Sequence, residues 1–129
     1  MSEMISVEII SPDKSIIKTN SSEVIIPSYE GEMGILKDHI PLITFLRPGI
    51  IKILGENEKN FFVEEGTVEL QNNNLLILTS TAIEISKMDK STINTFIKEA
   101  EININNDKVS DKEKYLLSYK ITTLKNISQ

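Results

Sequence analysis

The chain has 129 residues, 40% of them hydrophobic, and a formal net charge of −5, which allows one compact core with a small appendage but not two full domains. The absence of cysteine excludes disulfide frameworks, cysteine-ligated zinc, iron–sulfur clusters and thiol catalysis. The acidic balance and the presence of only one arginine, Arg47, argue against non-specific nucleic-acid binding and against phosphate clamps made of several arginines.

No part of the sequence has the properties of a membrane-spanning or exported segment. No run approaches the roughly 18 to 20 apolar residues that cross a bilayer. The start of the chain lacks a basic segment followed by an apolar run and a cleavage site. We therefore expect a soluble chain that is not exported.

The first two thirds of the chain are predicted to form short strands separated by turns. All five glycines and all four prolines lie within the first 66 residues. Runs rich in Ile, Val, Leu or Phe predict strands; they are Met4–Ile10, Glu23–Ile26, Ile50–Leu54, Phe61–Glu64, Thr67–Gln71 and Leu75–Thr79. This spacing is typical of an all-β sandwich or barrel. Asn72-Asn73-Asn74 and Gly55-Glu56-Asn57 are expected to be turns, because Asn and Gly tolerate positive φ.

The hydrophobic period changes from about Asp89 onward, where helical spacing begins. Apolar residues that would share one helical face recur at intervals of three and four; they are Ile93, Phe96, Ile97, Ala100 and Ile104. Asp89 stands where an N-cap is expected, because its carboxylate can accept backbone N–H bonds from the first turn. The polar run Asn105-Asn106-Asp107 ends the pattern and predicts a loop.

A second helix is predicted to start near Ser110, because Ser110-Asp111-Lys112-Glu113 has the spacing of a capping box. Its apolar stripe consists of Leu117, Ile121 and Leu124, with Leu116 and Ile127 beside it. Two short helices joined by a short loop form an antiparallel hairpin. The predicted fold is a mainly β N-terminal sandwich of two antiparallel sheets in residues 1–86, followed by an antiparallel α-helical hairpin in residues 87–129.

Charge is divided unequally between these two parts. Residues 1–86 hold 6 basic and 13 acidic side chains, whereas residues 87–129 hold 8 and 6. Residues 108–129 alone carry a net charge of +3, from five lysines and two acids. From charge alone, the hairpin is either attracted to an acidic partner or simply kept soluble by its lysines.

The densest group of unusual residues is Glu30–Leu42. Its two glycines, three residues apart, allow tight turns but match no phosphate loop or dinucleotide fingerprint. His39 is the only histidine, which excludes a multi-histidine metal site, and a hydrogen-bonding role is favoured over a catalytic one. Two alternatives stay open: a small hydrolase that uses His39 with Glu30 or Glu32, and a free-standing β-sandwich adaptor or ligand-binding module.

The same stretch, with Arg47-Pro48-Gly49 after it, resembles a characteristic segment of the epsilon subunits of F-type ATP synthases. Three further matches follow the family in order and spacing: Val7–Pro12, Phe61–Leu70, and Leu75–Thr79 with Thr81-Ala82. Similarity therefore covers nearly all of residues 4–86. The helical hairpin agrees with the family architecture without a sharp motif.

The resemblance implies a β-sandwich at the foot of the central stalk, in contact with the gamma subunit and the c-ring, with a hairpin that folds down or extends upward. It implies a non-catalytic rotor subunit of a proton-translocating ATP synthase, without catalytic residues, metal or cofactor of its own, peripheral on the cytoplasmic face of the bacterial inner membrane. The matching contact candidates on the c-ring side are Glu30, Gly31, Glu32, Asp38 and His39. The hairpin candidates for regulation through the alpha/beta catalytic head are Lys112, Lys114, Lys120 and Lys125.

The chain keeps some glycines of the family pattern and departs from that pattern at two places. The resemblance implies that Gly31, Gly34 and Gly49 serve backbone geometry. Many relatives have a Gly-Gly pair where this chain has Glu65-Gly66, which puts the turn geometry of the first glycine in doubt. Some relatives bind ATP through an aspartate followed three residues later by an arginine. Here Asp89 is present but Thr92 replaces the arginine, so ATP sensing is not expected and Asp89 is interpreted as a helix cap.

Overall fold

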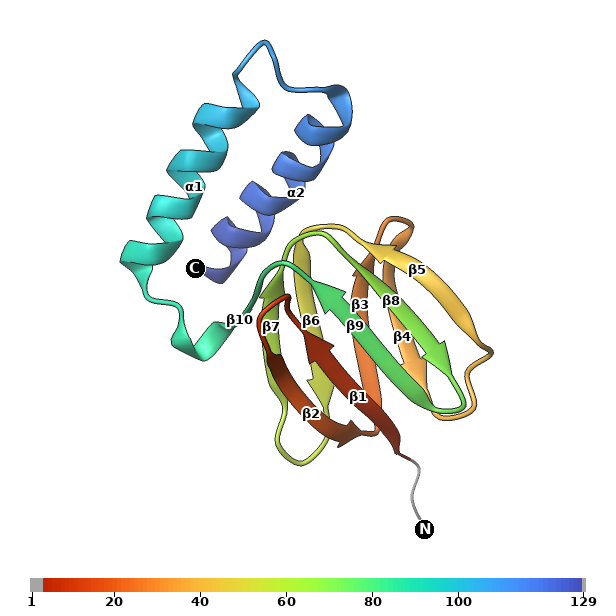
Figure 1. Ribbon diagram of the computed structural model, residues 1–129. Coiled ribbons are helices and arrows are strands. Elements are labelled where there is room, and N and C mark those ends of the chain that lie inside the picture. The colour runs from red at the N-terminus through yellow and green to blue at the C-terminus, as the bar shows by residue number, and fades with distance from the viewer. Residues whose placement is uncertain (1–3, 129) are drawn as a thin grey trace.

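In the computed structural model, which describes residues 4–128, ten β-strands form two facing layers and two helices pack at one end of them (Figure 1). The strands are β1 (Ile5–Ile10), β2 (Ser15–Ser21), β3 (Glu23–Ser28), β4 (Gly31–Leu36), β5 (Leu42–Leu46), β6 (Gly49–Leu54), β7 (Lys59–Val63), β8 (Gly66–Gln71), β9 (Asn74–Thr79) and β10 (Ala82–Glu84). A short 3-10 helix η1 (Ile85–Lys87) leads into α1 (Lys90–Ile104) and α2 (Asp111–Ile127). This order confirms the predicted sandwich followed by a helical hairpin.

Hydrogen bonds link the strands in the order β10-β7-β6-β3-β5-β8-β9-β1-β2, with β4 paired to β3. The sheet turns over between β3 and β5, where the described register contains the single pair Ser28 and Leu46. The two layers are therefore continuous through this corner. Among the described strand pairs, β1 and β9 run parallel and the others run antiparallel, so this pair is the exception to the predicted antiparallel arrangement.

The space between the layers is filled by one apolar core. Side chains alternate along the strands, as in β1, where Ile5, Val7 and Ile9 are buried and the residues between them are half-exposed. The other buried members of the core are Val24, Ile26, Ile35, Leu46, Ile51, Ile53, Phe61, Val63, Val68, Leu70, Leu75 and Ile77. Their burial is the main stabilising contribution to the sandwich.

Four strands are absent from the sequence prediction: β2, β4, β5 and β10. Within Glu30–Leu42, where the sequence predicts no strand and its glycines suggest tight turns, Gly31–Leu36 pairs with β3 over its whole length. Glycine and glutamate are poor strand formers, and β4 forms because tertiary pairing overrides local propensity. The predicted turns are confirmed, with Asn72 and Asn73 at φ values of 51° and 61° and Gly55 at 145°.

Local caps fix the start of both helices where the sequence predicts them. The Asp89 carboxylate accepts the backbone N–H of Thr92 at 2.7 Å, and Ser110 Oγ accepts that of Glu113 at 3.1 Å. Ser110 Oγ itself donates to the Glu113 carboxylate at 3.2 Å. One half of the capping box is thus formed, together with a direct side-chain bond between its two ends.

The hairpin packs on the outer face of the sandwich through a second, smaller apolar cluster. Phe62 of β7 points outward, is fully buried, and contacts Ile93 of α1 and Leu124 of α2. Partly buried side chains complete the cluster: Ile85, Met88, Phe96, Ile97 and Ile127. The hairpin is therefore folded down against the strands, and the predicted boundary after residue 86 falls within η1.

Candidate functional site

Glu30, Gly31 and Glu32 lie at the turn between β3 and β4, next to the hairpin end of the sandwich. Gly31 has a φ of 122°, which side chains strongly disfavour. Its carbonyl accepts a hydrogen bond from the buried Ser28 Oγ at 2.7 Å. Glu30 and Glu32 are exposed. The turn thus has a fixed backbone and presents two carboxylates to its surroundings.

Asp38 and His39 lie at the opposite end of β4, beside the turn between β8 and β9. Asp38 has a positive φ of 67°, and its backbone N–H donates to Asn73 Oδ1 at 2.7 Å. Asn73 Nδ2 donates in return to the Asp38 carboxylate at 3.3 Å. The backbone N–H of His39 donates to the carbonyl of Leu36 at 3.1 Å. The two bonds between Asp38 and Asn73 join two turns that are far apart in the sequence, and the bond from His39 closes its own turn.

The five predicted contact residues therefore form two groups rather than one. Gly31 and Glu32 are the first two of the six residues of β4, whereas Asp38 and His39 follow its last residue, Leu36. Along the strand, Glu32 and Leu36 are already roughly 14 Å apart at ~3.4 Å per residue. A catalytic arrangement of His39 with Glu30 or Glu32 is not assembled across such a distance. The two groups do share the exposed side of β4, where Glu32 and Leu36 are both exposed.

Close packing explains Gly49 and Gly66 but not Gly34. A Cβ atom on Gly49 would lie 2.6 Å from Cβ of Pro27, whereas one on Gly34 would meet, at 2.7 Å, only a carboxylate oxygen at the end of the flexible Glu23 side chain. A Cβ atom on Gly66 would collide with the backbone carbonyl of Leu78. Glu65 is not among the described residues with positive φ. Within residues 4–128 this position thus has no backbone need for the glycine that many family members have.

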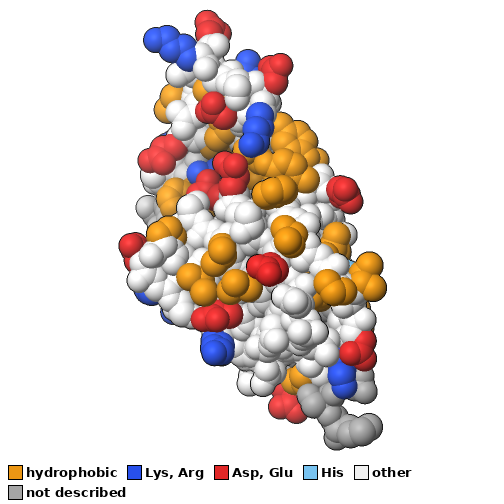
Figure 2. Space-filling view, turned by 45° about the vertical axis from the view of Figure 1, so that its right-hand side comes forward, with side chains coloured by type: hydrophobic (Ala, Val, Ile, Leu, Met, Phe, Trp, Pro, Cys, Tyr) orange, Lys and Arg blue, Asp and Glu red, His pale blue; other side chains and the backbone are white. Residues whose placement is uncertain are grey.

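One outer face of the sandwich carries large apolar side chains that no described residue covers. Ile43 is 76% exposed and Phe45 58%, both on β5, and Leu78 is 44% exposed on β9. β8 lies between these strands, where Thr67 pairs with both Phe45 and Leu78. Figure 2 shows hydrophobic side chains spread over this side of the molecule with acidic groups between them. We call Ile43, Phe45 and Leu78 the apolar face. The sequence signal for it is the run Leu42–Leu46, which has apolar residues at both inward and outward positions.

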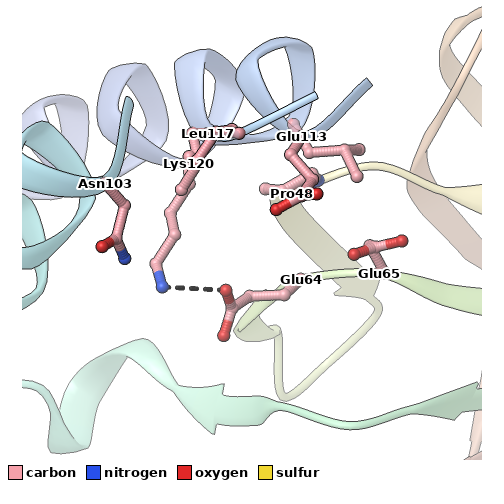
Figure 3. A pocket seen from close by; sticks show the side chains of 9 residues that line it. Pro48, Glu64, Glu65, Asn103, Glu113, Leu117 and Lys120 are labelled. Atoms are coloured by element: carbon pink, nitrogen blue, oxygen red, sulfur yellow. Dashed lines mark ion pairs between the residues drawn. The ribbon is translucent and has the colours of Figure 1, made fainter. Parts of the chain in front are cut away.

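A groove of about 380 Å³ separates α2 from the sandwich. Lys120 crosses it from α2, and its Nζ lies 2.8 Å from a carboxylate oxygen of Glu64 (Figure 3). Their side chains are only 19% and 29% exposed. The rest of the lining consists of Pro48, Glu65, Asn103, Val109, Glu113, Leu116 and Leu117. The groove is thus bordered by more acidic than basic groups.

The predicted regulatory lysines have different surroundings. Lys125 Nζ lies 3.7 Å from the carboxylate of Glu101 on α1, and both side chains are about half exposed. Lys112 and Lys114, in the first turn of α2, are exposed. Lys120 instead pairs with the sandwich. The structure therefore does not bring the four lysines together as one basic surface.

Beyond the groove, Arg47 connects the sandwich to α2. Its guanidinium carbon lies 3.9 Å from the ring centroid of Tyr119, and Nη1 donates to the Tyr115 hydroxyl at 3.3 Å. The ring centroids of Tyr115 and Tyr29 are 6.0 Å apart. We call Arg47, Tyr29, Tyr115 and Tyr119 the Arg47 cluster. Sequence reasoning did not find it, because its members come from three separate segments.

Asp89 caps α1 as predicted. The backbone hydrogen bond from Thr92, followed by a side-chain hydrogen bond from the same residue, lowers the pKa of Asp89 below its usual value of 3.8. The carboxylate is exposed and its described partners belong to its own helix. The described structure therefore agrees with a capping role for Asp89.

Comparison with known proteins gives a consistent result along the sequence. Residues 4–85 match the model of the beta-sandwich domain of the ATP synthase delta/epsilon chain. The ATP synthase epsilon chain of Pelagibacter ubique is 48% identical over 130 aligned positions, which cover 99% of this chain and 100% of that protein. The ATP synthase epsilon chain of Bordetella avium is 35% identical over 104 positions, 79% of this chain and 74% of that protein.

Solved structures agree at the level of the fold. A chain of the mitochondrial ATP synthase of Euglena gracilis, solved with OSCP, F1 and c-ring, superposes with a TM-score of 0.74 at 18% identity. The match covers 97% of this chain and 79% of that one. A chain of the central stalk and c-ring assembly of Tetrahymena thermophila gives a TM-score of 0.65 at 15% identity, with 96% of both chains covered.

Proposed function

Because the chain belongs to the family of ATP synthase epsilon chains, we propose that it is a non-catalytic rotor subunit that couples the membrane ring to the catalytic head. The observation that carries this proposal is similarity along its full length to an ATP synthase epsilon chain. Its mechanism is mechanical: torque passes through rigid attachments to neighbouring stalk subunits, and no bond is made or broken within this chain.

The apolar face is the proposed contact with the gamma subunit. Ile43 and Phe45 on β5 and Leu78 on β9 lie in one layer, with β8 between the two strands, and clustered exposed apolar side chains are typical of protein interfaces. Glu69, which pairs with Ile43 in the strand register, adds a polar group to this face. A rigid sheet suits this role, because its backbone hydrogen bonds resist deformation under torque.

The exposed side of β4 is the proposed contact with the c-ring. The two groups of candidate residues at the ends of β4 belong to one interface only if the ring lies along the strand. They are Glu30, Gly31 and Glu32 at one end and Asp38 and His39 at the other. The exposure of Gly34 and Leu36 between the two groups supports this orientation. The bonds of Asp38 and His39 to neighbouring backbone and to Asn73 give these two residues the role of holding the contact surface in shape.

The hairpin is the proposed regulatory part, which approaches the alpha/beta catalytic head when it leaves the sandwich. Lys112 and Lys114 are its exposed cations at the start of α2 and are available to acidic surfaces. Lys120 becomes available only after its pair with Glu64 has opened. Charge attraction to the head and docking on the sandwich therefore compete for the same lysine.

Within residues 4–128, no helix combines the length and hydropathy needed to cross a bilayer. The proposed location is peripheral, on the cytoplasmic face of the bacterial inner membrane, and attachment is through the complex rather than through lipid. The mitochondrial neighbour solved with F1 and c-ring supports membership in such an assembly.

Coupling is the property to test. Membrane vesicles depleted of this chain should hydrolyse ATP with little ion pumping, and the added wild-type chain should restore pumping per ATP hydrolysed. The double variant Ile43→Asp/Phe45→Asp should fail to restore it. Ile102→Asp, which changes a 71% exposed isoleucine on α1, is the matched control and should act as wild type. Full restoration by the double variant would contradict the proposed gamma contact, and unchanged pumping after depletion would contradict the coupling role.

A further inference from the structure

Polar attachment of the hairpin to the sandwich is concentrated on α2. All three tyrosines of the chain and its only arginine make up the Arg47 cluster, which joins the end of β3, the connection from β5 to β6, and α2. We propose that stacking of Arg47 on Tyr119 is the device that holds α2 against the sandwich and sets the fraction of undocked hairpin.

The arginine is held ready for this contact by its own backbone. The N–H of Arg47 donates to the carbonyl of Pro27 at 3.0 Å, and the buried Pro48 follows it. The guanidinium therefore projects from a fixed point of the sandwich. Its planar shape permits stacking on one ring while an edge N–H donates to a second group, here the hydroxyl of Tyr115.

The helix supplies a matching pair of rings. Tyr115 and Tyr119 are four residues apart on α2, a spacing that places them on one helical face, and their ring centroids are 4.9 Å apart in an edge-to-face arrangement. The Tyr115 hydroxyl also lies 3.5 Å from the carbonyl oxygen of Tyr29. One arginine thus engages two turns of α2 at once.

The other attachments have different properties. The second apolar cluster, around Phe62, includes Ile85 and Met88 of the segment that connects the sandwich to the hairpin. These two residues therefore belong to the segment about which the hairpin would pivot. The Lys120–Glu64 pair is a single ion pair and weakens with salt. The Arg47 contacts on α2, Tyr115 and Tyr119, lie in its first half and at its middle, away from the Phe62 contact with Leu124. Release of Arg47 therefore loosens this part of α2, where the buried Leu116 and the contact of Tyr115 with Tyr29 remain.

Distances between spin labels test this in the isolated full chain, without any other subunit. Because the sequence has no cysteine, the pair Ser22→Cys and Glu99→Cys provides labelling sites on the exposed surface of the sandwich and of α1. Pulsed electron paramagnetic resonance should give mainly one distance between the two spin labels in the parent, the doubly labelled chain without further substitutions. Arg47→Gln and, separately, Tyr119→Leu should raise the ratio of longer to parental distances about fivefold, the effect expected for loss of one cation–π contact.

Lys59→Gln is the matched control, because it removes one exposed cation from β7, and it should leave the distances unchanged. Circular dichroism reports whether the strands stay folded in each variant. If Arg47→Gln unfolds, Tyr119→Leu, which alters only the helix side of the contact, decides the outcome. Parental distance distributions in the folded variants would overturn the proposal. So would an equal change in the control.

Discussion

Lys120 of α2 forms a 2.8 Å ion pair with Glu64, at the end of β7 in the sandwich. A lysine that the charge pattern assigns to an external acidic surface is thus already engaged within the chain. The docked position of the hairpin shields Lys120 from solvent, so that its side chain is only 19% exposed. The hairpin lysines must therefore be substituted separately, because each has a different partner in the docked chain.

Replacement of Lys112 and Lys114 by glutamine should speed ATP hydrolysis by the reconstituted enzyme at low salt. Both lysines are exposed, so their loss weakens attraction to the catalytic head without opening the groove. Exposed pairs contribute about 0.2–1 kcal/mol each, so the effect should be graded and should fade at high salt. Lys120→Gln should give a smaller change, because it also releases the hairpin. Lys125→Gln, whose partner Glu101 lies within the hairpin, is the control. Unchanged hydrolysis in both the double variant and a hairpin deletion would contradict inhibition by the hairpin.

Helices and turns could be predicted from the sequence because their signals are local. Asp89 and Ser110 cap the helices they precede, and the asparagine turn has the positive φ values that asparagine tolerates. β4 could not be predicted this way, because its glycines and glutamate form a strand only through pairing with β3.

The candidate site was predictable only in part, for the same reason. Resemblance supplied the residues around Glu30 and His39 but not their separation, which depends on the length of an unpredicted strand. The Arg47 cluster depends on contacts across 68 residues of sequence. No local pattern reports such a contact, whereas the apolar run Leu42–Leu46 did contain a signal for the exposed Ile43 and Phe45.

Deletion of residues 88–129 should leave a cooperatively folded sandwich with a lower melting temperature. The main core lies within the strands, but Phe62 loses its cover. Phe62→Thr should therefore destabilise the full chain, but it should make the surface of the truncated chain less apolar. In the full chain it should cost about 2–4 kcal/mol of unfolding free energy, whereas in the truncated chain it should reduce dye binding to exposed apolar surface. Thermal melts followed by circular dichroism check the stabilities, and dye fluorescence checks the exposed apolar surface of the truncated chain. A disordered truncated chain would refute autonomy of the sandwich.

Asp89 should stabilise α1 in a pH-dependent manner. Because hydrogen bonding lowers its folded-state pKa below 3.8, the stabilisation is fully present above that value and is lost as the pH falls through the lowered pKa. Asp89→Ala should therefore lower the stability of the hairpin at neutral pH, and the difference from wild type should become smaller in acid, where the protonated carboxyl keeps only a neutral capping oxygen. Asp89→Asn retains a capping oxygen and should be closer to wild type at neutral pH. Helical circular dichroism at several pH values measures this, and a difference that persists unchanged in acid would contradict it.

ATP should bind to the isolated chain weakly or not at all. Thr92 occupies the position of the family arginine, and the chain has no arginine after Arg47, which is itself engaged with Tyr119. Calorimetric titration should give only heats of dilution, indistinguishable from a titration with inorganic phosphate. Tight stoichiometric binding would show that the hairpin holds nucleotide without a guanidinium group.

The most direct test of the rotor assignment is isolation of the tagged chain from detergent-solubilised membranes, followed by identification of everything that remains bound. The account predicts the gamma subunit, the c-ring and the catalytic subunits with the wild-type chain and with the Ile102→Asp control, and their loss with folded Ile43→Asp/Phe45→Asp. An intact ATP synthase that isolates without this chain, while the chain is recovered alone or with an unrelated acidic partner, would contradict it.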